Sequence, residues 1–171
     1  MAKEVSNIIE FTLIYNRHKV YLFNYVKKMV NNLSAAEDII QIVFLKFYEN
    51  LELIREKDKC EFWLFKTARN EVFNYYRSKK NKASCFENAD TDEILPIDDE
   101  GTEILFDRKE MNSIIMNELN SFPDEQRDVY LLKEYSGLSY KEIAGLMNID
   151  EELVKSRLFK IRRKLADKVS K

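Results

Sequence analysis

Between Phe62 and Lys80, cations, amides and aromatic rings recur at helical spacing, and this mixture of side chains could bind nucleic acid. Lysine and arginine follow phosphates, rings stack on bases or insert between them, and asparagine can hydrogen-bond to base edges. We therefore predict a surface for single-stranded nucleic acid, made of Lys66, Arg69, Asn70, Phe73, Asn74, Arg77 and Lys80. The alternative is that the rings belong to a hydrophobic core, where we expect Trp63 to lie.

A second basic segment runs from Glu151 to Lys171, where eight cations accompany three acids. A helix that follows a tight turn fits the major groove of DNA, with its N-terminal residues at base edges. The side of this segment opposite its apolar stripe carries Glu152, Lys155, Ser156, Phe159, Lys160 and Arg163, and three more cations could reach phosphates: Arg157, Arg162 and Lys164. The alternative is a solvated basic helix that makes no contact with DNA.

A third segment, residues 36–51, has apolar residues on both sides of its helical wheel. The expected core face holds Ala36, Ile40, Val43, Phe44, Phe47 and Leu51. The opposite face holds Asp38, Gln41, Ile42, Leu45 and Glu49. Apolar residues rimmed by polar ones often mark a protein interface, so this face is a candidate docking surface. A helix covered on both sides by its own domain is the alternative.

Metal, disulfide and catalytic chemistry find little support in the sequence. His18 is the only histidine, and Cys60 and Cys85 lack the C-x-x-C spacing of common zinc sites. We expect reduced, structurally incidental cysteines, no metal site, no cofactor and no catalytic residue. A metal-dependent nuclease is disfavoured because the densest carboxylates lie in a predicted linker without a histidine nearby.

The chain also lacks the patterns that mark membrane insertion or secretion. No run approaches the roughly 20 apolar residues that a transmembrane helix needs. The N-terminus does not show the basic and then apolar pattern of a signal peptide. We therefore expect a cytoplasmic protein that does not insert into a membrane.

Charge is segregated along the chain, although the formal net charge of its 171 residues is only −2. Nine acids and no cation lie between Glu87 and Asp107, in a stretch without a sustained apolar period. This pattern is typical of a solvated linker. We predict two domains, residues 1–84 and 108–171, joined by an acidic linker at 85–107.

Composition and helix signals predict an all-α protein, since the chain has only three Gly and two Pro. In the first domain we expect helices over about 8–30, 35–51 and 61–80, with Ser34 as the N-cap of the second. In the second domain, Pro123 opens one helix and Gly137 closes it, and Ser139 with Glu142 forms a capping box. Asn148 and Asp150 then lead into the last helix, which gives a helix-turn-helix order.

Three segments together resemble the extracytoplasmic-function (ECF) group of bacterial RNA polymerase sigma factors. AEDIIQIVFLKFYEN (36–50) resembles the family's region 2.2, and FWLFKTARNEVFNYYR (62–77) resembles regions 2.3 and 2.4. FPDEQRDVYLLKEYSGLSYKEIAGLMNIDEELVKSRLFKIRRKL (122–165) resembles region 4. The order, the spacing and the linker agree over most of the chain, which makes the match far more specific than any one motif.

The resemblance implies an all-α fold of two small domains, a region 2 helical bundle and a region 4 helix-turn-helix. It implies that the face with Asp38, Gln41, Ile42 and Leu45 docks on the β′ clamp helices of core RNA polymerase, which also contacts the factor through its β subunit. It further implies −10 recognition and melting by the segment around Asn70, Asn74 and Arg77. The family's −35 readers match Glu152, Lys155, Ser156, Phe159 and Lys160.

The resulting expectation is a sigma factor that is not an enzyme and that directs promoter-specific initiation. Its partners would be core polymerase, promoter DNA in duplex and melted form, and an anti-sigma factor. The rival hypothesis is a helix-turn-helix regulator that binds operator DNA without polymerase.

Overall fold

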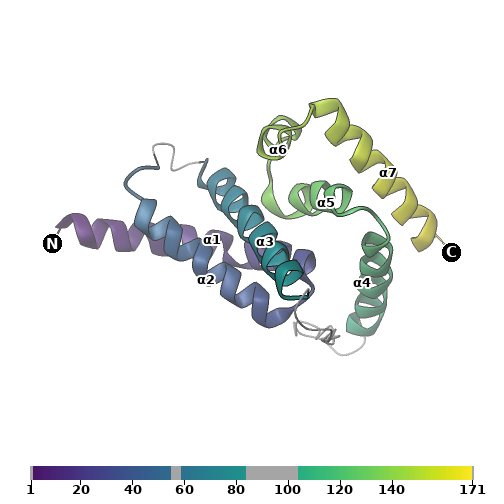
Figure 1. The fold of residues 1–171 in the computed structure, drawn as a ribbon, viewed down its shortest axis with the longest axis horizontal. Helices are drawn as coiled ribbons and strands as arrows, with labels where there is room; N and C mark the ends of the chain where they lie inside the picture. The colour runs from purple at the N-terminus through teal and green to yellow at the C-terminus, as the bar shows by residue number, and fades with distance from the viewer. Residues whose placement is uncertain (1, 55–58, 84–103, 171) are drawn as a thin grey trace. The chain divides into compact units, whose positions relative to one another are not determined.

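The computed structural model describes residues 2–54, 59–83 and 104–170, and within these ranges the chain forms seven helices and no strand (Figure 1). The chain divides into two compact units, Met1–Glu93 and Ile94–Lys171. The all-α fold with two helical domains is therefore confirmed. None of the helices in the described ranges combines the length and the hydrophobicity that crossing a bilayer requires.

The first unit is a bundle of three helices, α1 (Ala2–Val30), α2 (Leu33–Asn50) and α3 (Cys60–Ala83). No glycine or proline interrupts these segments, so each helix can run for many turns. Every helix packs against the other two. Their shared core is built around three fully buried rings, those of Tyr25, Phe47 and Phe65.

Two asparagines form the joint between α1 and α2. Asn31 takes the left-handed conformation with φ 51°, and its N–H donates to the Lys27 carbonyl at 2.9 Å. The Asn32 side chain then accepts from the Ala35 N–H at 2.7 Å and is the N-cap. The prediction that Ser34 caps this helix is therefore wrong, because Asn32 provides the cap two residues earlier and leaves Ser34 in the first turn.

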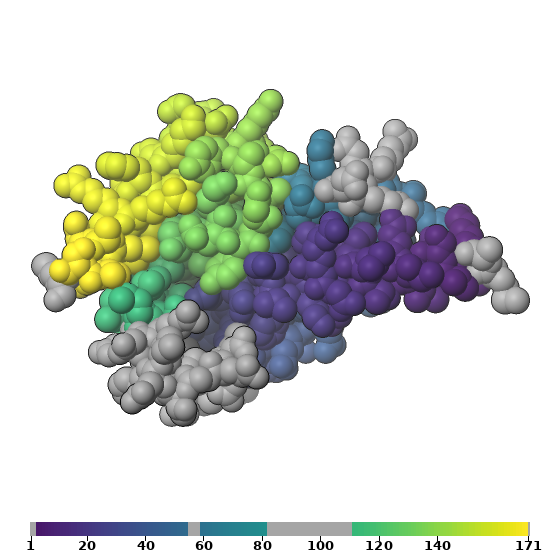
Figure 2. All heavy atoms as spheres, turned by 180° about the vertical axis from the view of Figure 1, so that it is seen from behind, coloured from purple at the N-terminus to yellow at the C-terminus, as the bar shows by residue number. Residues whose placement is uncertain are grey.

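Two other predictions for this unit need correction. Ile39 is buried on the core face of α2, whereas Ile40 is only partly buried. Trp63 contacts the Phe47 ring, with centroids 5.6 Å apart, but it remains partly exposed because it lies at the edge of the core. Figure 2 shows α1, in purple, at the surface of the first unit. Four apolar side chains of this helix are exposed, those of Val5, Ile9, Leu13 and Val20.

The second unit contains α4 (Ile104–Asn120), α5 (Asp124–Ser136), α6 (Tyr140–Met147) and α7 (Glu151–Val169). Helix α4 was not predicted, and it begins inside the 85–107 range proposed as a linker; residues 84–103 lie outside the described residues. The core of this unit holds Leu132, Ile143, Val154 and Ile161. The sequence predicts an apolar stripe on the last helix made of Val154, Leu158, Ile161, Leu165 and Val169, and of these five residues Val169 is exposed.

The turns between α5, α6 and α7 follow the sequence signals closely. Gly137 ends α5 with φ 70°, and Asn148 ends α6 with φ 55°. Ser139 and Glu142 form the predicted capping box, in which the Ser139 Oγ accepts from the Glu142 N–H at 3.2 Å. Asp150 occupies the N-cap of α7, although its side chain makes no capping hydrogen bond.

Two glycine substitutions compare a position at the end of a helix, Gly137, with a position inside a helix, Gly145. A β-carbon added at Gly145 or at Gly137 would meet no atom within 4 Å, so only conformation separates the two sites. Gly145→Ala should stabilise the second unit by about 0.5–1 kcal/mol, because alanine favours a helix. Gly137→Ala should destabilise it by about 1–2 kcal/mol, because φ is positive there. Denaturant unfolding of both variants checks the opposite signs.

Candidate nucleic-acid interface

The predicted single-strand surface lies along one side of α3. Lys66, Asn70, Asn74, Arg77 and Lys80 are exposed, and the opposite side of the helix buries Leu64, Phe65, Ala68 and Val72 in the core. Within the described ranges, the three lysine and arginine side chains of this exposed set make no ion pair. Their charges are therefore available to phosphate groups.

The aromatic part of this surface is held by a cation. Arg69 lies over the Phe73 ring at 4.5 Å from its centroid, and both side chains are partly buried. At this distance the guanidinium and the ring make a cation–π contact, which restricts both side chains. The alternative, in which these rings belong to the hydrophobic core, therefore does not fully describe Phe73, which is only partly buried.

A salt bridge removes the one acid of this segment from the basic surface. Lys46 of α2 binds Glu71 of α3 at 2.6 Å, and the Glu71 side chain is only 13% exposed. The charge of this carboxylate is offset by a lysine of another helix, so it lowers the positive potential of the neighbouring basic surface less than an unpaired acid would. Sequence reasoning missed this contact, because the two residues are 25 positions apart.

The candidate docking face lies on α2. Asp38, Gln41 and Glu49 are exposed, and between them Ile42 is 41% and Leu45 is 59% exposed. The first unit therefore does not cover this face with its described residues. Two aliphatic side chains within a polar rim give the composition expected of a protein interface.

The outward face of α7 carries most of the predicted duplex readers. Glu152, Lys155, Ser156, Lys160 and Arg163 are exposed, and Phe159 is 66% exposed. The buried side of the same helix contributes Val154, Leu158, Ile161 and Leu165 to the core. The order α5, turn, α6, turn, α7 places this face on the last helix of a helix-turn-helix (Figure 1).

Other cations of α7 are bound to carboxylates of the same unit. Arg157 binds Glu125 at 2.8 Å and is only 15% exposed, and Arg162 binds Glu134 at 3.4 Å. Lys164 binds Glu118 at 2.8 Å and lies over the Phe122 ring. In this structure the three cations predicted to reach phosphates instead attach α7 to α4 and α5.

The first turn of α7 contains a small charge cluster. Lys155 binds Glu152 at 3.1 Å and Glu151 at 3.2 Å. The hydrogen bonds that Lys155 donates to Glu152 and then to Glu151 raise the pKa of Lys155 above its ordinary value. The two acids at the start of the helix are thus partly neutralised, which lowers the repulsion that they would exert on phosphate.

Glu118 is the most connected of the anchoring carboxylates. It is bound by Lys164 and, at 3.6 Å, by Lys168. The hydrogen bond from Lys164 is the main reason that the pKa of Glu118 lies below its ordinary value of 4.5. Sequence reasoning did not identify Glu118, Glu125 or Glu134, because charged residues that orient a helix carry no motif.

Comparison with known families matches both units. The family model for Sigma-70 region 2 matches residues 14–82, and that for Sigma-70 region 4 matches residues 113–165. The RNA polymerase sigma factor SigZ of Bacillus subtilis is 31% identical over 148 residues, which cover 84% of this chain and 78% of that protein. The ECF RNA polymerase sigma-E factor of Escherichia coli is 27% identical and covers 93% of this chain and 86% of its own.

Solved structures show the same fold over nearly the whole chain. The sigma factor RpoE of Bartonella quintana, in complex with the anti-sigma factor NepR, has a TM-score of 0.71 at 18% identity, and the match covers 99% of this chain and 97% of that one. CnrH, in complex with the cytosolic domain of CnrY, has a TM-score of 0.64 at 20% identity, and the match covers 94% of this chain and 87% of CnrH.

The Glu118 ion pairs give a pH-dependent prediction for the anchoring of α7. A lowered folded-state pKa contributes stability that is present above 4.5 and is lost as the pH falls through the folded value. Glu118→Gln should therefore be less stable than the natural chain at neutral pH, and this difference should vanish well below pH 4.5. Thermal unfolding followed by circular dichroism measures it. Glu152→Gln, at an exposed pair, is the control, and an equal effect there would contradict the anchoring role.

Proposed function

Because the chain belongs to the ECF group of RNA polymerase sigma factors, we propose that its exposed faces divide the work of promoter recognition between the two units. The protein binds core RNA polymerase and directs promoter-specific transcription initiation. The observation that carries the division of labour is that each unit presents an exposed face with cations that make no ion pair within the described residues, namely Lys66, Arg77 and Lys80 on α3 and Lys160 and Arg163 on α7. The first unit acts on the −10 element and the second unit acts on the −35 element.

In the first unit, the α2 face docks on the polymerase. Ile42 and Leu45 supply apolar area that becomes buried on binding, and Asp38 and Gln41 supply polar contacts at its rim. The β′ clamp helices are the proposed partner of this face. The exposed side of α3 then holds the melted −10 strand, with Lys66, Arg77 and Lys80 on phosphates and with Asn70 and Asn74 at base edges.

Melting is supported by binding energy and not by a bond-breaking step. Unstacking one base costs a few kcal/mol, which contacts with the extruded base and with the strand can offset. The Arg69 and Phe73 pair offers a planar cation and a ring edge for such contacts. We accordingly assign no catalytic residue to the protein, and we place its action in the cytoplasm, with the polymerase.

In the second unit, α7 lies in the major groove at the −35 element. Lysine can bind the O6 and N7 atoms of guanine, glutamate can accept from the cytosine amino group, and phenylalanine can contact the thymine methyl group. Lys155, Lys160, Glu152 and Phe159 offer this chemistry on the exposed face. Arg163 and Ser156 lie on the same face and complete the proposed contact set, whereas Arg157 would first have to release Glu125.

An anti-sigma factor is the proposed inhibitor of this protein. The solved structure of RpoE contains the anti-sigma factor NepR, and that of CnrH contains the cytosolic domain of CnrY. A regulator that binds operator DNA without polymerase is not favoured. The region 2 match over residues 14–82 accounts for the first unit, which such a regulator would use for sensing or dimerisation.

Reconstituted transcription tests the function directly. Core RNA polymerase, the purified chain and a library of promoter sequences should yield initiation from a defined subset of promoters. Core polymerase alone should not select that subset. Binding of a short operator by the free chain, as tight as binding by the polymerase complex, would instead support the operator-binding regulator.

Substitutions on α7 should separate DNA binding from polymerase binding. Lys155→Ala and Lys160→Ala should each weaken −35 duplex binding by about 1–3 kcal/mol per lost base contact and leave core-polymerase affinity unchanged. Lys168→Ala is a matched control, because this lysine belongs to the same helix but binds Glu118. Fluorescence anisotropy with labelled promoter DNA gives the first affinity, and titration with core polymerase gives the second.

The reciprocal variant is Leu45→Asp, which places a charge in the apolar centre of the α2 face. We expect a loss of polymerase affinity of about 2 kcal/mol or more, as for a central interface residue. Binding of −35 DNA by the second unit should not change. A variant that loses both activities together would contradict the assignment of separate faces.

A further inference from the structure

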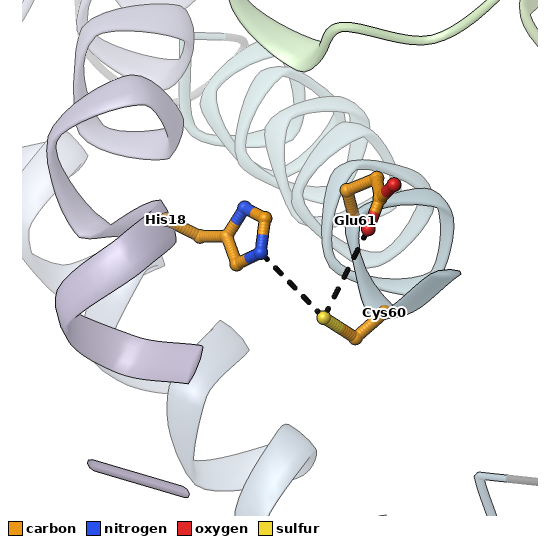
Figure 3. A group of neighbouring side chains, drawn as sticks. All are labelled: His18, Cys60 and Glu61. Atoms are coloured by element: carbon orange, nitrogen blue, oxygen red, sulfur yellow. Dashed lines mark hydrogen bonds between the residues drawn. The ribbon is translucent and has the colours of Figure 1, made fainter. Parts of the chain in front are cut away.

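A cluster of three metal-ligating side chains lies at the contact between α1 and the start of α3. His18 comes from α1, and Cys60 and Glu61 are the first two residues of α3 (Figure 3). Their nearest ligand atoms all lie within 4.8 Å of one another. The cluster is formed by the fold alone, since His18 and Cys60 are 42 positions apart.

The distances within the cluster fit the edges of a small coordination polyhedron. The Cys60 Sγ lies 3.6 Å from the His18 Nε2 and 4.0 Å from the Glu61 Oε2. In a tetrahedral zinc site, bond lengths of about 2.3 Å to sulfur and about 2.0 Å to nitrogen or oxygen separate neighbouring ligand atoms by about 3.5 Å. The two distances from Cys60 Sγ are close to that spacing, whereas the His18 and Glu61 ligand atoms are within 4.8 Å of one another and would move closer together around an ion.

Burial and charge also suit a divalent cation. Cys60 is buried, whereas His18 and Glu61 are partly buried, so an ion could enter from the solvent side. One thiolate and one carboxylate would neutralise the two positive charges, and the N-terminus of α3 favours anionic ligands in its first turn. Arg17 is the cation that acts on both His18 and Cys60, and it opposes the ion to some extent.

The three side chains are chemically suited to a metal ion. A neutral imidazole, a thiolate and a carboxylate are all common ligands of divalent cations, and burial is the main cause that lowers the pKa of His18 from its ordinary value. Burial, followed by the charge of Glu61, raises the pKa of the Cys60 thiol. The ligand types, one sulfur, one nitrogen and one oxygen, favour a thiophilic ion over Mg²⁺ or Ca²⁺, which prefer oxygen ligands.

We propose that His18, Cys60 and Glu61 form a binding site for a thiophilic divalent cation of the Zn²⁺ class, with a fourth position left to water. The site revises the expectation, drawn from sequence spacing, that Cys60 is incidental and that no metal is bound. The site does not depend on the roles proposed for the exposed faces in promoter recognition. Three protein ligands and an open position are the arrangement of an exchangeable site and not of a closed structural one.

Such an ion would connect α1 to the helix that carries the candidate −10 surface. Helix α1 packs against both α2 and α3, and α3 carries the candidate −10 surface from Lys66 onward. A metal that binds only the folded bundle stabilises it by mass action. The ion would thus fix the first turn of α3 against α1, at the end of the helix that precedes the DNA-binding face.

Cobalt substitution in the full chain provides a spectroscopic test. Co²⁺ added to the reduced, metal-free protein should produce a sulfur-to-metal charge-transfer band and the intense visible bands of a four-coordinate ion. Added Zn²⁺ should replace the Co²⁺ and abolish these bands. Cys60→Ser should lose the charge-transfer band. Cys85→Ser is the matched control and should retain it. A chain without the band, or a band that follows Cys85 instead of Cys60, overturns the proposal.

Affinity measurements test the other two ligands. His18→Gln and Glu61→Gln should each reduce Zn²⁺ affinity by more than about 10-fold in competition with a chromophoric chelator, since even loss of an outer-shell partner costs that much. In the alternative, His18 and Glu61 only hydrogen-bond to the Cys60 thiol. Glutamine can also accept that hydrogen bond, so the Zn²⁺ affinity would then be the same in both variants as in the natural chain. Zn²⁺ should raise the melting temperature of the natural chain and of Cys85→Ser, and an equal rise in His18→Gln or Glu61→Gln overturns the three-ligand set.

Discussion

The pairing of carboxylates with selected cations decides which positive charges the protein presents to solvent. On α7, Glu118, Glu125 and Glu134 bind cations on the sides of the helix that meet α4 and α5, while Lys160 and Arg163 make no ion pair within the described residues. On α3, the acid Glu71 is paired with Lys46 of α2, so its charge is offset in the same way. A chain with a net charge of −2 can therefore carry two local surfaces suited to DNA.

These ion pairs orient helices more than they stabilise them. Exposed pairs contribute about 0–1 kcal/mol each, whereas burying one large apolar side chain contributes about 1.5–3 kcal/mol. Stability therefore comes from the two cores, with Tyr25, Phe47 and Phe65 in one unit and Leu132, Ile143 and Ile161 in the other. The pairs act on a fold that the cores already hold together, and they add contacts from α7 to α4 and α5.

The sequence predicted local features well and contacts between distant residues poorly. Gly137, Asn148 and the Ser139 capping box were recognisable because each satisfies a backbone requirement within a few residues. Asn32 took the cap expected of Ser34 because two neighbouring residues competed for one role. The pairing of Arg157 with Glu125 and the approach of His18 to Cys60 span 32 and 42 positions, and only the packed helices bring them together. The exposed sets on α2, α3 and α7 were found because helical periodicity places them, although their roles stay predictions.

The exposed ring of Phe159 has a thermodynamic consequence for the α7 face. In the unbound chain about two thirds of this side chain is hydrated, at 66% exposure. In the proposed complex, packing this ring against a thymine methyl group would remove hydrocarbon from water on both molecules and would make the heat capacity change of association negative. Contacts by the neighbouring lysines release counterions from the duplex and make the affinity depend on ionic strength. Calorimetry can therefore distinguish the nonpolar and ionic parts of recognition by a single helix.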